Sequence, residues 1–247
     1  METDATKAQT SKKDDSVRAA EIRKAASEPL LEFVARHGKE AVLDTGGSLL
    51  VLEIMLQTHG GTYSRSLLHS SLVIFPFHMG ISELSHRITS DYLSHLSHSL
   101  ALFLDQSAAT KTLLELIAAP YPAPPAPPSH PIDSSHVARL YKTLLQGGHF
   151  DQSSKSITKP SSSFSPSKFA SAFMVTIGRD VIVAMAGGSG AFVIAELCNR
   201  VGTEGTGGER ELLRTWLTED GFNESILDKG PKGRNILLES IDSLLST

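Results

Sequence analysis

The sequence has a single cysteine, Cys198, in 247 residues, which excludes a disulfide framework and indicates a reducing compartment. Aromatic residues are scarce, at 6%, although 40% hydrophobic and 20% charged residues indicate a mostly folded protein of one large or two small domains. The longest apolar run, 181–197, is interrupted by Gly-Gly-Ser-Gly and is a poor membrane span. Residues 1–24 are charged and lack the apolar stretch of a signal peptide. The formal net charge of −4 is not that of a self-sufficient nucleic-acid binder.

One segment pattern occurs three times: an apolar helix, a short break that contains glycine, and a second apolar helix. The copies are EAVLDTGGSLLVLEIML (40–56), DVIVAMAGGSGAFVIAELC (180–198) and NESILDKGPKGRNILLESI (223–241). When their apolar pairs are superimposed, Ser48, Gly190 and Gly233 fall at one position. Such self-similarity predicts an all-α solenoid of stacked helical repeats, and it excludes most enzyme folds.

The chain divides by composition into four regions. Residues 1–16 are polar and are expected to be disordered. Residues 17–60 form a first helical unit, 61–133 form a looser insert rich in Ser, His and Pro, and 134–247 form the remaining helical repeats. Within the first unit, Pro29 resembles a helix start and Gly38 a helix end.

Further helices are predicted at 113–118, at 135–146 before Gly147-Gly148, and at 168–177. The serine-rich stretch 153–167 is expected to be a loop, and 202–208 a flexible link.

The segment 181–196 imitates a catalytic element. It could be a strand, a phosphate-binding turn and a helix, as in dinucleotide-binding folds, but the spacing is not G-x-G-x-x-G. Ala191 stands where a nucleophile elbow needs glycine. A corner between two helices, where small residues allow close approach, is the favoured reading. Cys198 is likewise read as a small buried hydrophobe rather than a catalytic thiol.

Asp91, His95 and His98 would share one helical face and could ligate zinc, or they could simply be solvated. The sequence contains no P-loop, no H-E-x-x-H and no paired acidic motif. We therefore expect no enzymatic activity, no cofactor, no metal, no small-molecule substrate and no membrane contact.

Basic residues gather at two places. Lys12, Lys13, Arg18, Arg23 and Lys24 lie near the N-terminus, and Lys229, Lys232 and Arg234 lie at the last break. The second group surrounds a predicted helix start, where backbone N–H groups and cations together can hold an anion such as a nucleic-acid phosphate. A solvated loop with Asp228 as a local partner is the alternative, and the residues alone leave both open.

Several segments resemble a known family. They are SKKD (11–14), EPLLEFVARHGKEAVLD (28–44), LYKTLLQGG (140–148), GAFVIAELC (190–198) and KGRNILLESIDSLLST (232–247). Together they look like the CPL (C-terminal Penguin-like) region of the Puf-A/Penguin branch of Pumilio-homology proteins. The resemblance covers about 11–56 and 134–247 and leaves out the middle.

The resemblance implies a curved array of Puf repeats that binds RNA, either pre-ribosomal RNA or mRNA, with little sequence preference. It also implies a nuclear and nucleolar location, pre-ribosomal assembly factors as partners, and roles in large-subunit biogenesis and translational repression. Phosphates would be contacted by Arg179, Lys229, Lys232, Arg234 and the basic N-terminal helix, and Asn235 could also touch RNA.

Classical Puf repeats read bases from the second helix, and the matching positions here are Leu49, Leu50 and Glu53; Ala191, Phe192 and Ala195; and Arg234, Asn235 and Leu238. Because two copies lack a polar residue at the last of these positions and none has the usual Gln, base-by-base readout is expected to be lost. The alternative function is a protein-interaction scaffold without nucleic-acid contact. Basic residues on one concave face would favour RNA, and scattered ones would favour protein partners.

Overall fold

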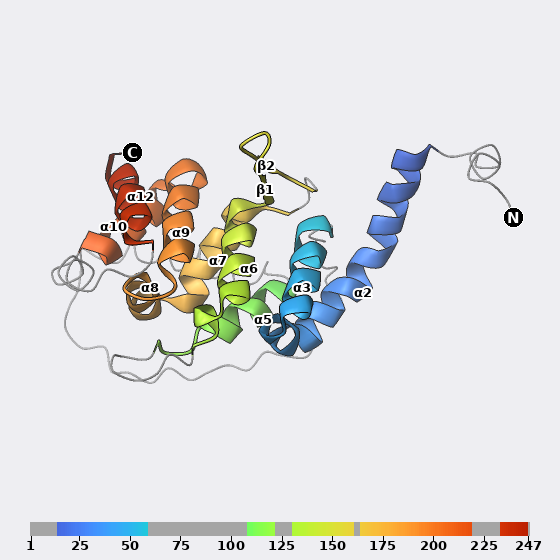
Figure 1. Ribbon diagram of the computed structural model, residues 1–247, viewed down its shortest axis with the longest axis horizontal. Helices are drawn as coiled ribbons and strands as arrows, with labels where there is room; N and C mark the ends of the chain where they lie inside the picture. The colour runs from blue at the N-terminus through green and yellow to red at the C-terminus, as the bar shows by residue number, and fades with distance from the viewer. Residues whose placement is uncertain (1–13, 59–107, 122–129, 161–163, 219–232, 247) are drawn as a thin grey trace, which may run out of the picture.

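The structure is a computed structural model that describes residues 14–58, 108–121, 130–160, 164–218 and 233–246. The described part is predominantly helical, as predicted (Figure 1). The helices are α2 (Asp15–Leu43), α3 (Thr45–Gln57), α5 (Ala108–Ile117), α6 (Ser135–Gln146), α7 (Pro166–Ile177), α8 (Arg179–Ala186), α9 (Ala191–Glu204), α10 (Gly207–Thr218) and α12 (Arg234–Ser246), with a 3₁₀ turn η2 (Pro131–Asp133) before α6.

Four helices, α3, α6, α9 and α12, lie side by side in a row (Figure 1). They run in the same direction, because like ends meet along the row. At one edge, His136 Nε2 at the start of α6 lies 3.2 Å from the carbonyl oxygen of Leu43, just before α3. At the same edge, Phe192 at the start of α9 touches Gly233 at the start of α12. The helices α2, α5 and α7 form a second layer behind the row.

The opposite edge of the row is held by two arginines. Arg200 of α9 donates from Nε to the carbonyl oxygen of Leu145 (2.9 Å) and from Nη2 to that of Gln146 (2.8 Å). Arg214 of α10 donates from Nη2 to the carbonyl oxygen of Leu244 (2.9 Å). The last carbonyls of a helix have no partner within it, so these side chains complete the C-terminal ends of α6 and α12.

Helix α2 is longer than predicted, because Pro29 does not start it and Gly38 does not end it. It runs from Asp15 to Leu43 with Pro29 inside it, so the helix tolerates both the hydrogen bond that proline cannot donate and the crowding of its ring against the carbonyl four residues earlier. Gly38 is buried against α5, where a Cβ would lie 3.4 Å from Leu113. The nearest neighbour of such a Cβ would be Val34 of the same helix, at 3.1 Å, and Gly38 is part of the buried face of α2 rather than its end.

Part of the region assigned to a loose insert belongs to the core. Helix α5 packs between α2 and α7, and its Leu113, Leu114 and Ile117 are fully buried. The buried hydroxyl of Tyr141 in α6 donates to the carbonyl oxygen of Leu113. Within the region 61–133, residues 108–121 and 130–133 thus belong to the described fold, and the helix predicted at 113–118 corresponds to α5. The rest of that region lies outside the described residues, as do Asp91, His95 and His98.

The Gly-Gly-Ser-Gly sequence forms the predicted corner between two helices. The alternative strand is wrong, because Val181 to Met185 are helical in α8. A Cβ on Gly190 would approach the Cβ of Met185 to 2.9 Å, and one on Gly188 would overlap the hydroxyl of Tyr121. Small residues are therefore required here by close approach of the chain.

Two further expectations are corrected. The serine-rich loop includes half of a short antiparallel hairpin, β1 (His149–Asp151) and β2 (Ser156–Thr158). The expected link 202–208 is mostly helical, since α9 continues to Glu204 and α10 begins at Gly207. The helices at 135–146 and 168–177 are confirmed, and Gly147 adopts φ = 76° at the end of α6. Among the described helices no single one is long and apolar enough to cross a membrane; α7 and α8 reach that length only as a pair bent by 104°.

Candidate nucleic-acid interface

The basic residues predicted near the N-terminus lie on the first half of α2. Arg18, Arg23 and Lys24 are exposed, and Arg18 lies 3.8 Å from the carboxylate of Asp15. This half of the helix projects from the rest of the protein (Figure 1). Lys12 and Lys13 lie outside the described residues.

The other predicted contacts lie far from this helix. Arg179 begins α8 and lies 3.6 Å from Asp180. Arg234 and Asn235 begin α12, at the opposite end of the molecule from the first half of α2 (Figure 1). Lys229 and Lys232 lie outside the described residues. The structure therefore does not bring the described members of the predicted set together on one face.

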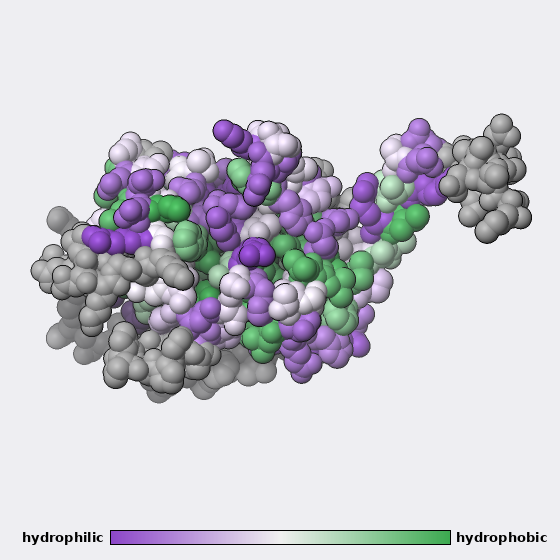
Figure 2. Space-filling model, viewed as in Figure 1, coloured by the Kyte–Doolittle hydropathy of each residue, from purple (hydrophilic) through white to green (hydrophobic). Residues whose placement is uncertain are grey.

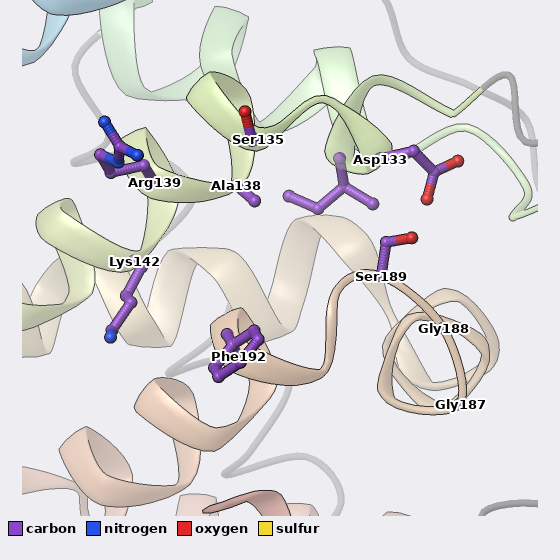
Figure 3. Close-up of a pocket in the computed structure, with 10 residues that line it drawn as sticks. Asp133, Ser135, Ala138, Arg139, Lys142, Gly187, Gly188, Ser189 and Phe192 are labelled. Atoms are coloured by element: carbon purple, nitrogen blue, oxygen red, sulfur yellow. The ribbon is translucent and has the colours of Figure 1, made fainter. Parts of the chain in front are cut away.

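A groove lies instead between α6 and the corner that joins α8 to α9 (Figure 3). We call it the α6–α9 groove; its volume is about 710 Å³ and it is lined by Ile132, Asp133, Ser135, Ala138, Arg139, Lys142, Gly187, Gly188, Ser189 and Phe192. The groove opens on the side of the molecule where α3, α6, α9 and α12 lie in a row. Of these residues, only Phe192 and the glycine-rich corner were considered as site candidates from the sequence.

Arg139 and Lys142 are the charged residues that sequence reasoning missed. They lie three apart on α6 and therefore on one side of it, opposite the buried Tyr141 and Leu144. Neither has a hydrogen-bond or ion-pair partner among the described residues. Their spacing on the polar face of an amphipathic helix was the available signal, but only the fold shows that this face borders a groove.

Asp133, the acidic residue among those that line the groove, already accepts a hydrogen bond within the protein. Asp133 Oδ1 accepts a hydrogen bond from the Tyr121 hydroxyl (2.8 Å), which itself accepts one from the Ser189 N–H (3.2 Å). Burial, and then the hydrogen bond to Asp133, raise the pKa of Tyr121, so the phenol stays protonated and this link persists at neutral pH. The link ties the chain before α6 to the corner before α9.

Three N–H groups of the glycine-rich corner already have partners. The N–H of Gly187 is bonded to Val183, that of Gly188 to Met185, and that of Ser189 to Tyr121. A phosphate-binding turn instead presents free N–H groups to its ligand. The backbone hydrogen bonds here stabilise the conformation of the corner itself.

Four of the positions that align with the base-reading residues of classical Puf repeats make contacts within the protein or are buried in it. Glu53 Oε1 lies 2.7 Å from His149 Nε2, which connects α3 to the hairpin. Ala191 and Ala195 are buried in the core. Phe192 is 36% exposed, and the tip of its ring meets Gly233, whose added Cβ would stand 2.8 Å from Cζ. The loss of base-by-base readout stays a prediction.

Neither thiol nor metal chemistry is evident in the described residues. Burial raises the pKa of the Cys198 thiol to about 12, so it behaves as the small buried hydrophobe that was predicted. The described residues contain no group of three or more His, Cys, Asp or Glu that could hold a metal ion.

Comparison with known families settles where this chain belongs. The family model of the CPL (NUC119) domain matches residues 1–155. The chain belongs to the CPL (NUC119) domain family. No curated protein matches the chain, and no solved structure matches it. The CPL domain gives the chain a nucleolar, Pumilio-like family context.

The CPL match covers more of the middle and less of the end than the resemblance did. It runs through 57–133, which the resemblance left out, and stops before α7. Arg139 and Lys142 therefore lie within the matched CPL domain, whereas Phe192 and the glycine-rich corner lie outside it. The α6–α9 groove spans the boundary of the match.

Proposed function

We propose that this CPL-domain protein is a non-enzymatic RNA-binding module with the architecture of a Puf-like repeat solenoid. In this proposal it acts in the nucleus and nucleolus, in biogenesis of the large ribosomal subunit together with pre-ribosomal assembly factors, and in translational repression. Its RNA would be pre-ribosomal RNA or mRNA.

The row of helices supports the solenoid. In repeat proteins each unit contacts mainly its neighbours, and equivalent helices stack in the same direction. The parallel contacts of α3, α6, α9 and α12 have this character, and three of these helices are the second helices of the sequence copies. Helix α6 would be a fourth member that the glycine-containing pattern did not detect.

The observation that carries RNA binding is the pair Arg139 and Lys142 on the exposed side of this row. Two cations that have no partner among the described residues are suited to phosphate oxygens, because no ion pair within that part of the chain must be broken first. Contacts of this kind recognise the backbone and not the base, which agrees with the loss of the base-reading positions.

The test is binding of the full chain to unrelated single-stranded and duplex RNAs across a salt series. We expect affinity to ignore sequence and to fall linearly with salt on logarithmic axes. A variant with Arg139→Gln and Lys142→Gln should lower the salt slope by about 1 to 2. The variant to compare with it replaces Arg18, Arg23 and Lys24 with Gln. It removes cations from the far end of the molecule instead of from the groove. Absence of binding by folded protein would refute the proposal.

A protein-interaction scaffold is the second candidate, and one observation favours it. Leu49 and Leu50, in the second turn of α3, are 55% and 52% exposed. Figure 2 shows hydrophobic residues on this face over α3. If Leu49→Ser with Leu50→Ser released the protein from pre-ribosomal particles while Arg139→Gln with Lys142→Gln did not, the scaffold would replace RNA binding as the function.

A further inference from the structure

No residue in the first half of α2 is buried. The buried residues of this helix begin at Ser27 and lie in the part that packs against α3 and α5. Residues 15–26 project from the rest of the protein (Figure 1). A helix of about a dozen residues is marginal in water by itself, so a partner that covered this part of α2 would stabilise it.

An apolar stripe runs along the projecting helix. Its members recur every three or four residues and are Ala19, Ile22, Ala26, Leu30 and Phe33. Ile22 is 60% exposed, and Leu30 and Phe33 are also exposed. The buried residues Leu31 and Val34 each follow a stripe residue by one position, so they lie about 100° further round the helix. Figure 2 shows hydrophobic residues along the projecting part of α2. The stripe is therefore a second apolar face, with the spacing of a face that packs against another helix.

The stripe is complementary to itself when two copies run in opposite directions. If Ala26 lies opposite Ala26 of the other copy, Ile22 lies opposite Leu30, and the small Ala19 lies opposite the large Phe33. Large side chains thus meet small or medium ones, and the alanines at the centre allow the two helices to approach closely.

The charges beside the stripe are complementary in the same arrangement. Arg18 and Glu32 are fourteen positions apart, close to four whole turns, and so lie on one line along the helix. In the antiparallel pair, Arg18 of one copy lies near Glu32 of the other, and Asp15 lies near Arg36. A parallel pair would instead bring Arg18 near Arg23 of the other copy. Within one copy these charges form the exposed pairs Asp15–Arg18, at 3.8 Å, and Glu32–Arg36, which cost little to rearrange.

We propose that the projecting half of α2 is a dimerisation surface, on which α2 of a second copy of this chain packs antiparallel and centred on Ala26. The seam at 19–33 is about 21 Å long at 1.5 Å per residue, which is short for an interface between proteins. The expected product is a reversible dimer with a dissociation constant on the order of micromolar. The proposal does not depend on RNA binding, because the α6–α9 groove has no part in it.

A nucleic acid fits this face of α2 less well than a second helix does. The stripe itself is apolar, whereas a phosphate backbone needs cations. The basic residues of this helix also alternate with acids, which are Asp15, Glu21, Glu28 and Glu32.

The first experiment is sedimentation equilibrium of the full chain from low micromolar to about 200 μM protein. The apparent mass of the wild type should rise from 26.5 kDa toward twice that value. Ile22→Gln with Leu30→Gln should weaken the dimer at least about 100-fold, because both copies lose two apolar contacts. Leu49→Gln with Leu50→Gln is the matched control, since these exposed leucines lie on α3, and it should leave the dimer unchanged. Gln is a good helix former, and circular dichroism at 222 nm checks that both variants keep the helical content of the wild type.

A second experiment tests the antiparallel arrangement by exchanging charges. Arg18→Glu places acids at both 18 and 32, and Glu32→Arg places cations at both, so each variant alone should dimerise about tenfold more weakly than the wild type. An equimolar mixture of the two variants should dimerise as the wild type does, because every pair of opposed charges is then opposite in sign.

The results separate this proposal from the others. A wild type that stays monomeric over the whole range would overturn it, as would a dimer that the Ile22 and Leu30 variant leaves intact or a mixture of charge variants that stays weak. If the wild type is monomeric and the Ile22 and Leu30 variant is lost from pre-ribosomal particles, the stripe binds a different protein. RNA affinity measured at protein concentrations where the chain is monomeric should be equal in the wild type and this variant, so either proposal can fail without the other.

Discussion

Replacement of Arg200 should destabilise the contact between α6 and α9 more than replacement of Glu204, its half-exposed ion-pair partner. Its side chain is 11% exposed, and it donates to the carbonyl oxygens of Leu145 and Gln146 and pairs with Glu204 at 2.6 Å. A hydrogen bond to a charged group is worth about 1.5–3 kcal/mol, so the two bonds to α6 contribute about 3 kcal/mol at the lower limit. The pair with the half-exposed Glu204 adds less than about 1 kcal/mol.

Arg200→Met retains an apolar stem and removes the bonds, and Glu204→Gln is the matched control. Urea denaturation followed by circular dichroism at 222 nm should give a loss of about 3 kcal/mol for the first and less than about 1 kcal/mol for the second. For a chain of this length the first loss corresponds to a fall in Tm of roughly 6–12 °C. A loss from Arg200→Met no larger than that from Glu204→Gln would refute the reasoning.

Three further predictions concern the corner before α9, the buried core and the hairpin. Gly188→Ala would overlap the Tyr121 hydroxyl and should cost about 1–3 kcal/mol in urea denaturation, whereas the Cβ of Gly187→Ala would make only an ordinary contact, 3.6 Å from the carbonyl oxygen of Ala184, and should cost less than about 1 kcal/mol; equal effects would contradict the close approach. Cys198 should resist a thiol reagent in the native protein and react fully in denaturant, because its pKa is about 12 and it is buried; rapid native labelling would show that α9 opens locally. Hydrogen bonds from the neighbouring serines lower the pKa of Asp151 to about 2, so its contribution to hairpin stability is present above the ordinary pKa of 3.8 and is lost as pH falls through about 2; an NMR titration of the carboxylate with a midpoint near 3.8 would contradict this.

Local sequence signals predicted the helices whose ends are marked by capping residues in the sequence. Helix α6 has an amphipathic pattern that ends at Gly147 in the left-handed conformation, and α7 begins behind Ser165, whose hydroxyl accepts from the N–H of Lys168. The corner before α9 was also predicted, because its small residues recur in the other copies. In these places sequence, local structure and packing agree.

The failures arose where distant contacts decide the outcome. Gly38 reads as a helix end, yet the space it leaves is filled by α5, about seventy positions later in the chain. Helix α6 was not recognised as a member of the row, because the chain enters it through a 3₁₀ turn at Pro131–Asp133 and not through a glycine-containing break. Arg139 and Lys142 carry no motif, and their meeting with Phe192 depends on how α6 lies against α9.

The common direction of α3, α6, α9 and α12 also has an electrostatic consequence. In an antiparallel bundle the peptide dipoles of neighbouring helices cancel, but in this row they add. Each helix start carries about half a positive charge, so four starts place roughly two positive charges along one edge. The opposite, negative edge is covered at α6 and α12 by Arg200 and Arg214. The edge that bears Arg139 and Phe192 thus receives a positive dipole field, part of which is offset by the carboxylates of Asp44, which caps α3, and of Asp133, which precedes α6.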